Sequence, residues 1–372
     1  ESYLISCADK NETALISDLI DHSETTLEIT IPALTEYAKT FGAEKTIETL
    51  FDNPTDLDWL ALKKLVYNLD ELLLKKLKKE ILLVSKKMNT LSNENQILLG
   101  FKTLGILDKI EKTEFFNKFN VQNQLFHEND NLLFSLADFY DSIEEYDKAL
   151  EYYEKSLTII LKVHGDQHSL AADAFNKLGI VYRTKGEYDK AIEFYDKALA
   201  IRLKVLGDQH PSTGISYNNL GLVYKFQGKY DKAIEFYDMA LAIKLRVHGN
   251  QHPSTGNTYG NFGSVYMSKE EYSRAIEYFD KALAIRLKVH GDQHPSTGAS
   301  YGWLGSVYWA KGEYDKAIEY HEKSLAILLK VHGDQHTSTG TSYNSLGNSY
   351  KEKKQYSTAK QYFQKAHDIF LK

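Results

Sequence analysis

The chain has 372 residues, of which 42% are hydrophobic, so it is long enough to bury a sizeable core and its composition excludes a wholly disordered protein. Its 45 basic and 51 acidic residues give a formal net charge of −6, which argues against a general attraction to nucleic acid or to an anionic membrane and leaves only a local basic groove open. Cys7 is the one cysteine, which excludes an internal disulfide and a cysteine-based zinc cluster and favours a reducing, cytoplasmic location.

Residues 1–128 have no repeating period but contain leucine-rich amphipathic stretches, and we expect them to form helices. Asn53 followed by Pro54 is typical of a helix start. The apolar stretch from Leu69 to Val84 is interrupted by charges before it reaches the roughly 20 residues that a membrane span needs, so we expect no membrane insertion. We interpret 1–128 as a helical N-terminal region, either a capping domain or degenerate repeats. The alternative is a partner-binding module of unknown kind.

The sequence repeats with a period of 42 residues from about Asn129 onward. A short motif of glycine, acid or asparagine, glutamine and histidine recurs at this step, and its histidines are His168, His210, His252, His294 and His336. A fixed period of this size predicts a solenoid or array. We divide residues 129–372 into six units, with approximate bounds 129–168, 169–210, 211–252, 253–294, 295–336 and 337–372.

Each unit has the pattern of two helices joined by a turn. In the third unit a first apolar face recurs at spacings of three and four residues, at Tyr217, Leu220, Gly221 and Tyr224. Gly228 interrupts this pattern, a second apolar face follows, and a further glycine ends it. We therefore predict a helical hairpin in every unit, with small residues such as Gly221 letting the two helices approach closely.

The order of these residues, continued by Ala233, Tyr237 and Ala240, resembles the tetratricopeptide repeat (TPR) pattern. The 42-residue unit is similar to the cargo-binding repeats of kinesin light chains and to arrays that serve as sensor or scaffold arms in large signalling proteins. The resemblance covers about residues 129–372 and implies an all-α fold, a right-handed α-solenoid of TPR helical hairpins preceded by the helical N-terminal region. Residues 1–128 contain fewer consecutive heptads than the coiled coil through which kinesin light chains bind their heavy chain needs.

The joint between units concentrates residue types that bind metals, and histidines such as His248 and His252 lie four residues apart. A glycine separates them, so they do not share a helix, and no third ligand is near in the sequence. We therefore predict no metal site and interpret the joint as structural. In this interpretation Gly207 ends a helix in a left-handed cap, the following acid and amide satisfy free backbone groups, and Pro211 begins the next helix.

The sequence contains no phosphate-binding loop of the GxxxxGK type and no HExxH motif. We expect no catalytic residues, no enzymatic activity and no cofactors. Because the chain begins at Glu1 and its last helical pattern runs to Lys372, we interpret it as a piece of a larger protein.

In TPR arrays the first helix of each hairpin lines a concave groove. Repeats that share a fold but differ at one position show that packing does not dictate that position. The residue after a constant tyrosine varies and is predicted to face the groove: Arg183, Lys225, Met267, Trp309 and Lys351. Phe226, next to Lys225, completes this candidate set.

A second groove position lies two residues before the constant Leu-Gly pair and is occupied by Asn176, Asn218, Gly260, Gly302 and Asn344. An asparagine side chain donates and accepts hydrogen bonds at once, and this ladder resembles the one by which peptide-binding TPR domains hold extended ligands. The two glycines are expected to leave room for an apolar pocket beside Met267 and Trp309.

Such a groove suits a short extended peptide with an aromatic or large apolar anchor and acidic neighbours. We predict a scaffold or adaptor that binds protein partners through short peptide motifs, with self-association or an intramolecular partner domain left open. One alternative is a regulatory or sensor arm of a larger signalling enzyme whose catalytic domain lies outside these residues. The other is that the groove residues are ordinary solvent-facing residues, with Trp309 packed on a neighbour.

Overall fold

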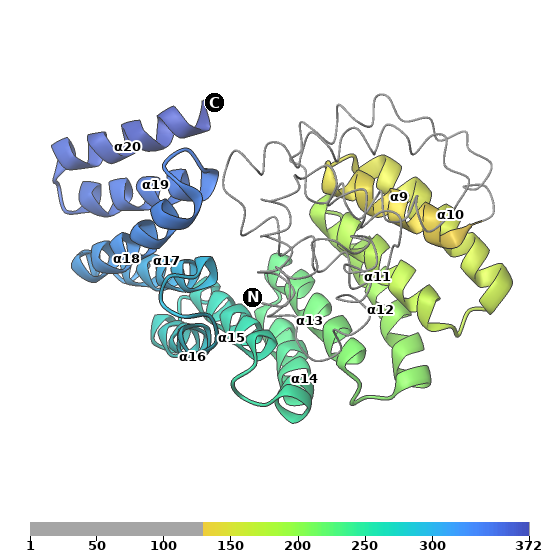
Figure 1. Ribbon diagram of the computed structural model, residues 1–372. Helices are drawn as coiled ribbons and strands as arrows, with labels where there is room; N and C mark the ends of the chain where they lie inside the picture. The colour runs from red at the N-terminus through yellow and green to blue at the C-terminus, as the bar shows by residue number, and fades with distance from the viewer. Residues whose placement is uncertain (1–128, 372) are drawn as a thin grey trace, which may run out of the picture. The chain divides into compact units, whose positions relative to one another are not determined.

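Figure 1 shows the computed structural model, which describes residues 129–371. The predictions for residues 1–128, including the helix start at Asn53, lie outside the described residues. The chain divides into two compact units, Glu1–Asp166 and Gln167–Lys372.

All regular structure within residues 129–371 is helical, and no strand occurs there. The first unit contains α9 (Asp130–Ser142) and α10 (Tyr146–His164). The second contains α11 (Ser169–Thr184), α12 (Tyr188–Leu206), α13 (Pro211–Phe226), α14 (Tyr230–His248), α15 (Pro253–Ser268), α16 (Tyr272–His290), α17 (Pro295–Ala310), α18 (Tyr314–His332), α19 (Thr337–Glu352) and α20 (Tyr356–Phe370). Consecutive helices pack in pairs, so the prediction of an all-α array of helical hairpins is confirmed.

The hairpin of the first unit begins at Asn129, whose side-chain oxygen accepts a hydrogen bond from the backbone N–H of Leu132 at 2.9 Å. Asparagine at this position satisfies a backbone donor that the helix leaves free. Tyr153 of α10 is fully buried, and its hydroxyl donates to Asp138 of α9.

In the second unit the five hairpins follow one another in chain order along a curved row (Figure 1). We call the odd-numbered helices α11 to α19 the first helices and the even-numbered helices α12 to α20 the second helices. Each first helix packs on its own second helix, and α13, α15, α17 and α19 also pack on the second helix of the preceding hairpin.

The two helices of a hairpin meet where a glycine of the first helix faces a ring of the second. A Cβ atom on Gly221 would lie 2.7 Å from the ring of Tyr237, which is fully buried. The same contact joins Gly263 to Phe279 and Gly305 to His321. The predicted role of Gly221 in close helix approach is therefore confirmed.

The constant tyrosine of each first helix also packs within its hairpin. Tyr224 stacks on Phe236 of α14, with ring centroids 5.4 Å apart and planes 6° apart. Tyr182 and Tyr308 make equivalent stacks at 5.3 Å. This packing accounts for the constancy of the tyrosine.

The turn inside each hairpin needs one residue with positive φ. Gly228 occupies it with φ 72°, and Gly186 and Gly312 are equivalent. In other hairpins Glu270 (φ 61°) and Lys354 (φ 60°) adopt the same conformation, which is sterically unfavourable for any residue with a Cβ atom.

The joint between hairpins differs from the predicted left-handed cap. Gly207 has φ 88° and ψ 169°, an extended conformation of positive φ that is nearly exclusive to glycine. The next helix is capped by His210, whose Nδ1 accepts from the backbone N–H of Ser212 at 3.1 Å. Thr213 donates from its hydroxyl to the carbonyl oxygen of Gly207 at 2.8 Å. The histidine therefore fulfils the role predicted for the acid and amide, while Pro211 begins α13 as predicted.

We predict that Gly221→Ala lowers the free energy of unfolding by about 2 kcal/mol, because the added methyl group overlaps the buried ring of Tyr237. Urea denaturation followed by circular dichroism measures this change. Gly302→Ala is the matched control, since only Ser324 Oγ lies within 4 Å of its Cβ position, at 3.4 Å. In the control the higher helix propensity of alanine should raise stability by about 0.5 kcal/mol. Equal effects at both sites would contradict the close-approach explanation.

We predict that Glu270→Gly stabilises the protein by about 1 kcal/mol, since glycine adopts φ 61° without a Cβ clash. The reverse change, Gly228→Glu, should destabilise it by a similar amount. Melting temperatures of the two variants test the pair together. A decrease for Glu270→Gly would show that this glutamate has a compensating interaction.

We predict a pH-dependent contribution from His321, because burial lowers its pKa to about 4 from an unfolded value of about 6.5. The stability that neutral, buried His321 contributes is fully present above about pH 6.5. As the pH falls below that value, the unfolded chain binds the proton first and stability is lost progressively down to about pH 4. The loss between about pH 7 and about pH 5 should be roughly 2 kcal/mol.

His321→Phe should remove this part of the pH dependence, since Phe279 fills the equivalent place against Gly263. The measurement compares urea denaturation of the original chain and the variant across that pH range. Parallel curves for the two proteins would contradict the prediction.

Candidate functional site

The candidate groove lies on the side of the second unit that its first helices line. Helix α11 lies against α13, α13 against α15 and α17 against α19, whereas no pair of second helices in the described part of the chain approaches as closely. Elements on the inner side of a curved array lie closer together than those on the outer side. The first helices therefore form the inner side, and the predicted groove residues project from them.

The asparagine ladder is hydrogen-bonded between hairpins. Asn219 of α13 donates from Nδ2 to Asn176 Oδ1 of α11 at 2.8 Å, and Asn261 of α15 donates to Asn218 Oδ1 of α13 at 2.9 Å. Asn176 is buried and Asn218 is half-buried. The side-chain oxygens of Asn176 and Asn218 are thus engaged by the next hairpin.

The apolar pocket expected beside Gly260 does not form. Trp303 of α17 occupies that space, because a Cβ atom on Gly260 would lie 2.7 Å from its ring. The indole also packs on Phe279, with ring centroids 5.4 Å apart, and the Arg286 guanidinium lies 4.5 Å from its centroid. Sequence reasoning missed Trp303, although it stands at the position where Asn219 and Asn261 donate. Space remains at Gly302, where only Ser324 Oγ is near.

Lys225 carries a partly buried charge on the inner side. Its Nζ donates to the hydroxyl of Ser264 on α15, and its charge lies 5.5 Å from the ring centroid of Phe226. Desolvation lowers its pKa, and no carboxylate within residues 129–371 forms an ion pair with it. Phe226 itself stacks on Tyr188 at 5.8 Å and leaves 47% of its side chain exposed.

Arg183 lies beside two buried hydroxyl groups. The hydroxyls of Tyr195 and Tyr237 are inaccessible to solvent and have no hydrogen-bond partner of good geometry among residues 129–371. Burial raises the pKa of Tyr195 to about 12, and the nearby Arg183 guanidinium opposes that rise. Burial likewise raises the pKa of Tyr237, again opposed by Arg183. Arg183 therefore places a positive charge on α11 close to these two hydroxyls.

The remaining candidates differ in accessibility. Met267 is half-buried and packs against the core formed by α14 to α17, whereas Trp309 is 39% exposed on α17. Asn344 and Lys351 of α19 are both exposed and line a cavity on the last hairpin. Five candidates therefore lie on α11 and α13, and the others lie on α15, α17 and α19. The first group is Asn176, Arg183, Asn218, Lys225 and Phe226, and the second is Met267, Trp309, Asn344 and Lys351.

The joint histidines pair with each other and cap helices. The rings of His248 and His252 stack with centroids 4.3 Å apart, and His252 accepts from the backbone N–H of Ser254 at 3.2 Å. The described residues contain no group of three or more histidine, cysteine, aspartate or glutamate side chains placed to hold a metal ion. The geometry of these histidines is that of a structural joint.

The sequence Gly298 to Gly302 spells G-x-S-x-G, the spacing of a hydrolase nucleophile. Here it lies inside α17 and not at a strand-to-helix turn. Ser300 is fully buried, and its hydroxyl accepts a hydrogen bond from Arg286 at 2.7 Å. The serine hydroxyl thus lies in a junction between hairpins and is removed from solvent.

No helix within residues 129–371 combines the length and the apolar character that a bilayer crossing requires.

Comparison with solved structures finds similar repeat proteins. The chain is similar to BtubC (BKLC) from P. vanneervenii at 23% identity and a TM-score of 0.52, over 61% of this chain and 91% of that one. It is also similar to a Rap protein complexed with Competence and Sporulation Factor, at 15% identity and a TM-score of 0.53, over 88% of this chain and 98% of that one. A putative kinesin light chain from Podosopora anserina matches at 26% identity and a TM-score of 0.48, over 54% and 96%. The first two likenesses show the fold.

A comparison with curated protein sequences gave no match. The model of the tetratricopeptide repeat family matches residues 130–204, 170–246, 227–288, 254–327 and 296–372. These matches overlap and together cover all of the hairpins described above, which is more than half of the chain. The chain therefore belongs to the tetratricopeptide repeat family.

Proposed function

We propose that the inner side of the second unit binds an extended peptide segment of a protein partner that carries acidic and aromatic or large apolar side chains. TPR proteins are generally scaffolds for protein–protein interaction. The proposal adds the chemistry of the ligand and the residues that hold it.

The observation that carries the proposal is a pair of cations on α11 and α13 that form no ion pair with a carboxylate of residues 129–371. Arg183 lies beside two buried hydroxyls, and Lys225 is held by the neutral hydroxyl of Ser264. A partly desolvated cation is stabilised by an anion more strongly than by a hydroxyl group. Acidic side chains of a peptide would supply that anion.

The ladder amides and the exposed rings support the rest of the ligand. Asn176 and Asn218 keep their amide nitrogens as donors for peptide carbonyl oxygens, because only their oxygens are engaged by the next hairpin. Phe226 and Trp309 expose 47% and 39% of their side chains, and aromatic groups of this kind act as anchors at binding surfaces.

The test is a fluorescence-polarisation screen with a labelled library of extended peptides that contain glutamate and tryptophan at fixed positions. We expect Asn176→Ala with Asn218→Ala to lower the affinity for the best-binding peptide by about tenfold, because hydrogen bonds to peptide carbonyl groups are lost. Asn219→Ala with Asn261→Ala is the matched control, since it removes the same hydrogen bonds between hairpins and keeps the ladder side chains. Equal weakening by both pairs would mean that the ladder is structural only.

The cations are tested separately. Arg183→Gln with Lys225→Gln should lower the affinity for an acidic peptide by about tenfold or more. The double variant should also make that affinity less dependent on salt concentration. Lys197→Gln, which removes an exposed cation paired with Glu193 on α12, should leave binding unchanged. An acidic peptide that binds the double variant as tightly as the original chain would refute the proposed site.

A further inference from the structure

Two second helices of the array hold a tyrosine hydroxyl in the protein interior without an acceptor. Tyr195 of α12 and Tyr237 of α14 are fully buried, and neither hydroxyl has a hydrogen-bond partner of good geometry among residues 129–371. A buried hydroxyl that forms no hydrogen bond destabilises a folded protein, because in the unfolded chain water solvates it. Packing against the glycine of the first helix does not require the hydroxyl, since Phe279 and Phe363 fill the same place in other hairpins.

The first hairpin satisfies the equivalent hydroxyl with a carboxylate of the chain. Tyr153 of α10 donates to Asp138 of α9, and the carboxylate of Asp141 lies nearby. In the next two hairpins the positions of these two aspartates are occupied by one apolar and one cationic residue, namely Ile180 and Arg183, then Leu222 and Lys225. At Tyr195 and Tyr237 the chain thus supplies neither of the carboxylates that surround Tyr153.

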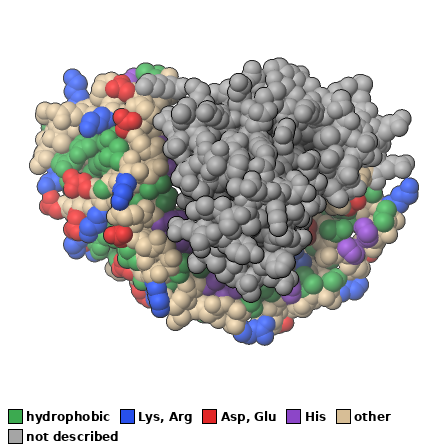
Figure 2. Space-filling model, viewed as in Figure 1, with side chains coloured by type: hydrophobic (Ala, Val, Ile, Leu, Met, Phe, Trp, Pro, Cys, Tyr) green, Lys and Arg blue, Asp and Glu red, His purple; other side chains and the backbone are tan. Residues whose placement is uncertain are grey.

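Arg183 of α11 connects the two hydroxyls. Its guanidinium lies close enough to both of them to oppose the rise in their pKa values that burial causes. It forms no ion pair with a carboxylate of residues 129–371. Exposed lysines of the second helices do form such pairs, for example Lys323 with Glu319 at 2.7 Å, and Figure 2 shows cationic and acidic side chains interspersed over the hairpins at its left. Arg183 and the two hydroxyls are thus neighbouring donor groups without an anionic acceptor in the described part of the chain.

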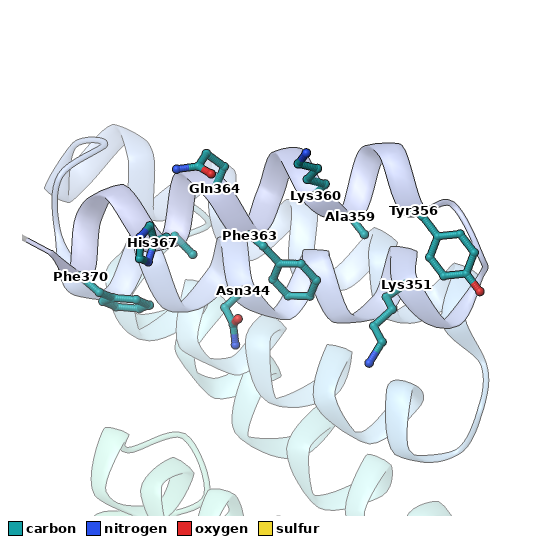
Figure 3. Close-up of a pocket in the computed structure, with 10 residues that line it drawn as sticks. Asn344, Lys351, Tyr356, Ala359, Lys360, Phe363, Gln364, His367 and Phe370 are labelled. Atoms are coloured by element: carbon teal, nitrogen blue, oxygen red, sulfur yellow. The ribbon is translucent and has the colours of Figure 1, made fainter.

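The last hairpin shows how these positions lie relative to the groove. The positions of Asn176, Arg183 and Tyr195 are occupied there by Asn344, Lys351 and Phe363. Figure 3 shows the ring of Phe363 between the asparagine and the lysine, and all three side chains line one cavity. The ring position of a second helix therefore borders the same space as the two groove positions of its first helix. By this equivalence, Tyr195 borders the groove between Asn176 and Arg183.

We propose that Arg183, Tyr195 and Tyr237 bind one carboxylate group of a ligand. The carboxylate accepts hydrogen bonds from the two hydroxyls and from the guanidinium, and it takes the role that Asp138 has beside Tyr153. Its two oxygens offer about four acceptor positions, which match two hydroxyls and the paired N–H groups of an arginine. That the carboxylate is an acidic side chain of a peptide rests on the function proposed above, whereas the anion site itself does not.

The ligand reaches the hydroxyls only when a neighbouring side chain moves, because both hydroxyls are closed to solvent in the described structure. The Arg183 side chain is long and only half-buried, so it can change rotamer and open the site. Without the ligand the two unmet hydroxyls destabilise the protein, and a bound carboxylate removes this effect. The site thereby links ligand binding to stability.

Removal of the hydroxyls alone gives the first test. Tyr195→Phe with Tyr237→Phe keeps both rings, as Phe279 does at the equivalent position. The free double variant should melt about 3 °C higher than the original chain, because two unmet buried hydroxyls are lost. Tyr153→Phe is the matched control and should melt lower, since its hydroxyl donates to Asp138. A lower melting temperature for the double variant would mean that the hydroxyls already have a structural acceptor, and it would overturn the proposal.

Acetate probes the site without a peptide. In the full chain isotopically labelled at tyrosine Cζ, the NMR signals of the two residues are those that Tyr195→Phe and Tyr237→Phe each remove. At constant ionic strength, acetate in place of chloride should shift both signals along one saturation curve, and Arg183→Gln should abolish the shift. A tighter response to inorganic phosphate would overturn the carboxylate assignment in favour of a phosphoryl group. No response to either anion would refute the site.

The peptide from the screen above separates this inference from the proposed function. Tyr195→Phe with Tyr237→Phe should lower its affinity about tenfold or more, as expected for hydrogen bonds to a charged group, and Tyr153→Phe should leave it unchanged. If the double variant binds normally while Arg183→Gln with Lys225→Gln does not, the groove stands and the role of the hydroxyls is refuted. If no peptide binds but acetate shifts both tyrosine signals, the carboxylate site stands and the proposed function fails.

Discussion

The close contact between a glycine of the first helix and a ring of the second is the constraint on which every hairpin of the second unit depends. The glycine leaves no room for a side chain, so the ring lies directly on the helix backbone and is removed from solvent at Tyr195, Tyr237 and Phe279. The flat shape of the ring is required, but its chemistry is not. The array therefore tolerates two buried hydroxyls that have no partner of good geometry among residues 129–371 and, at His321, an imidazole held neutral by burial.

The side chain at one position of the second helix differs between hairpins along the array. Arg202 and Arg286 are almost fully buried, and each donates to a serine hydroxyl of the next first helix, at Ser216 and Ser300. A buried cation is tolerated only where such partners satisfy it, so these junctions specify which helix follows. At the equivalent position the last hairpin has Phe370, which needs only apolar contact.

The proposed groove arises from the way in which successive hairpins are stacked. On the inner side, neighbouring hairpins bring the same position of successive first helices into a row, and side chains that packing does not dictate vary along it. Lys225, which differs from the methionine and tryptophan at the equivalent positions of α15 and α17, represents this kind of residue.

The sequence by itself determined the hairpins, their order and the positions that vary, because the spacing of three and four residues is local and the 42-residue period repeats it. It also located the turn residues, although the extended conformation of Gly207 depends on how the next helix is attached. Only the tertiary structure decided which groove groups are free. Asn219 reaches Asn176, and Trp303 fills the space at Gly260, over 43 residues in each case. Such contacts join positions that are one residue out of register, so a comparison of equivalent positions does not detect them.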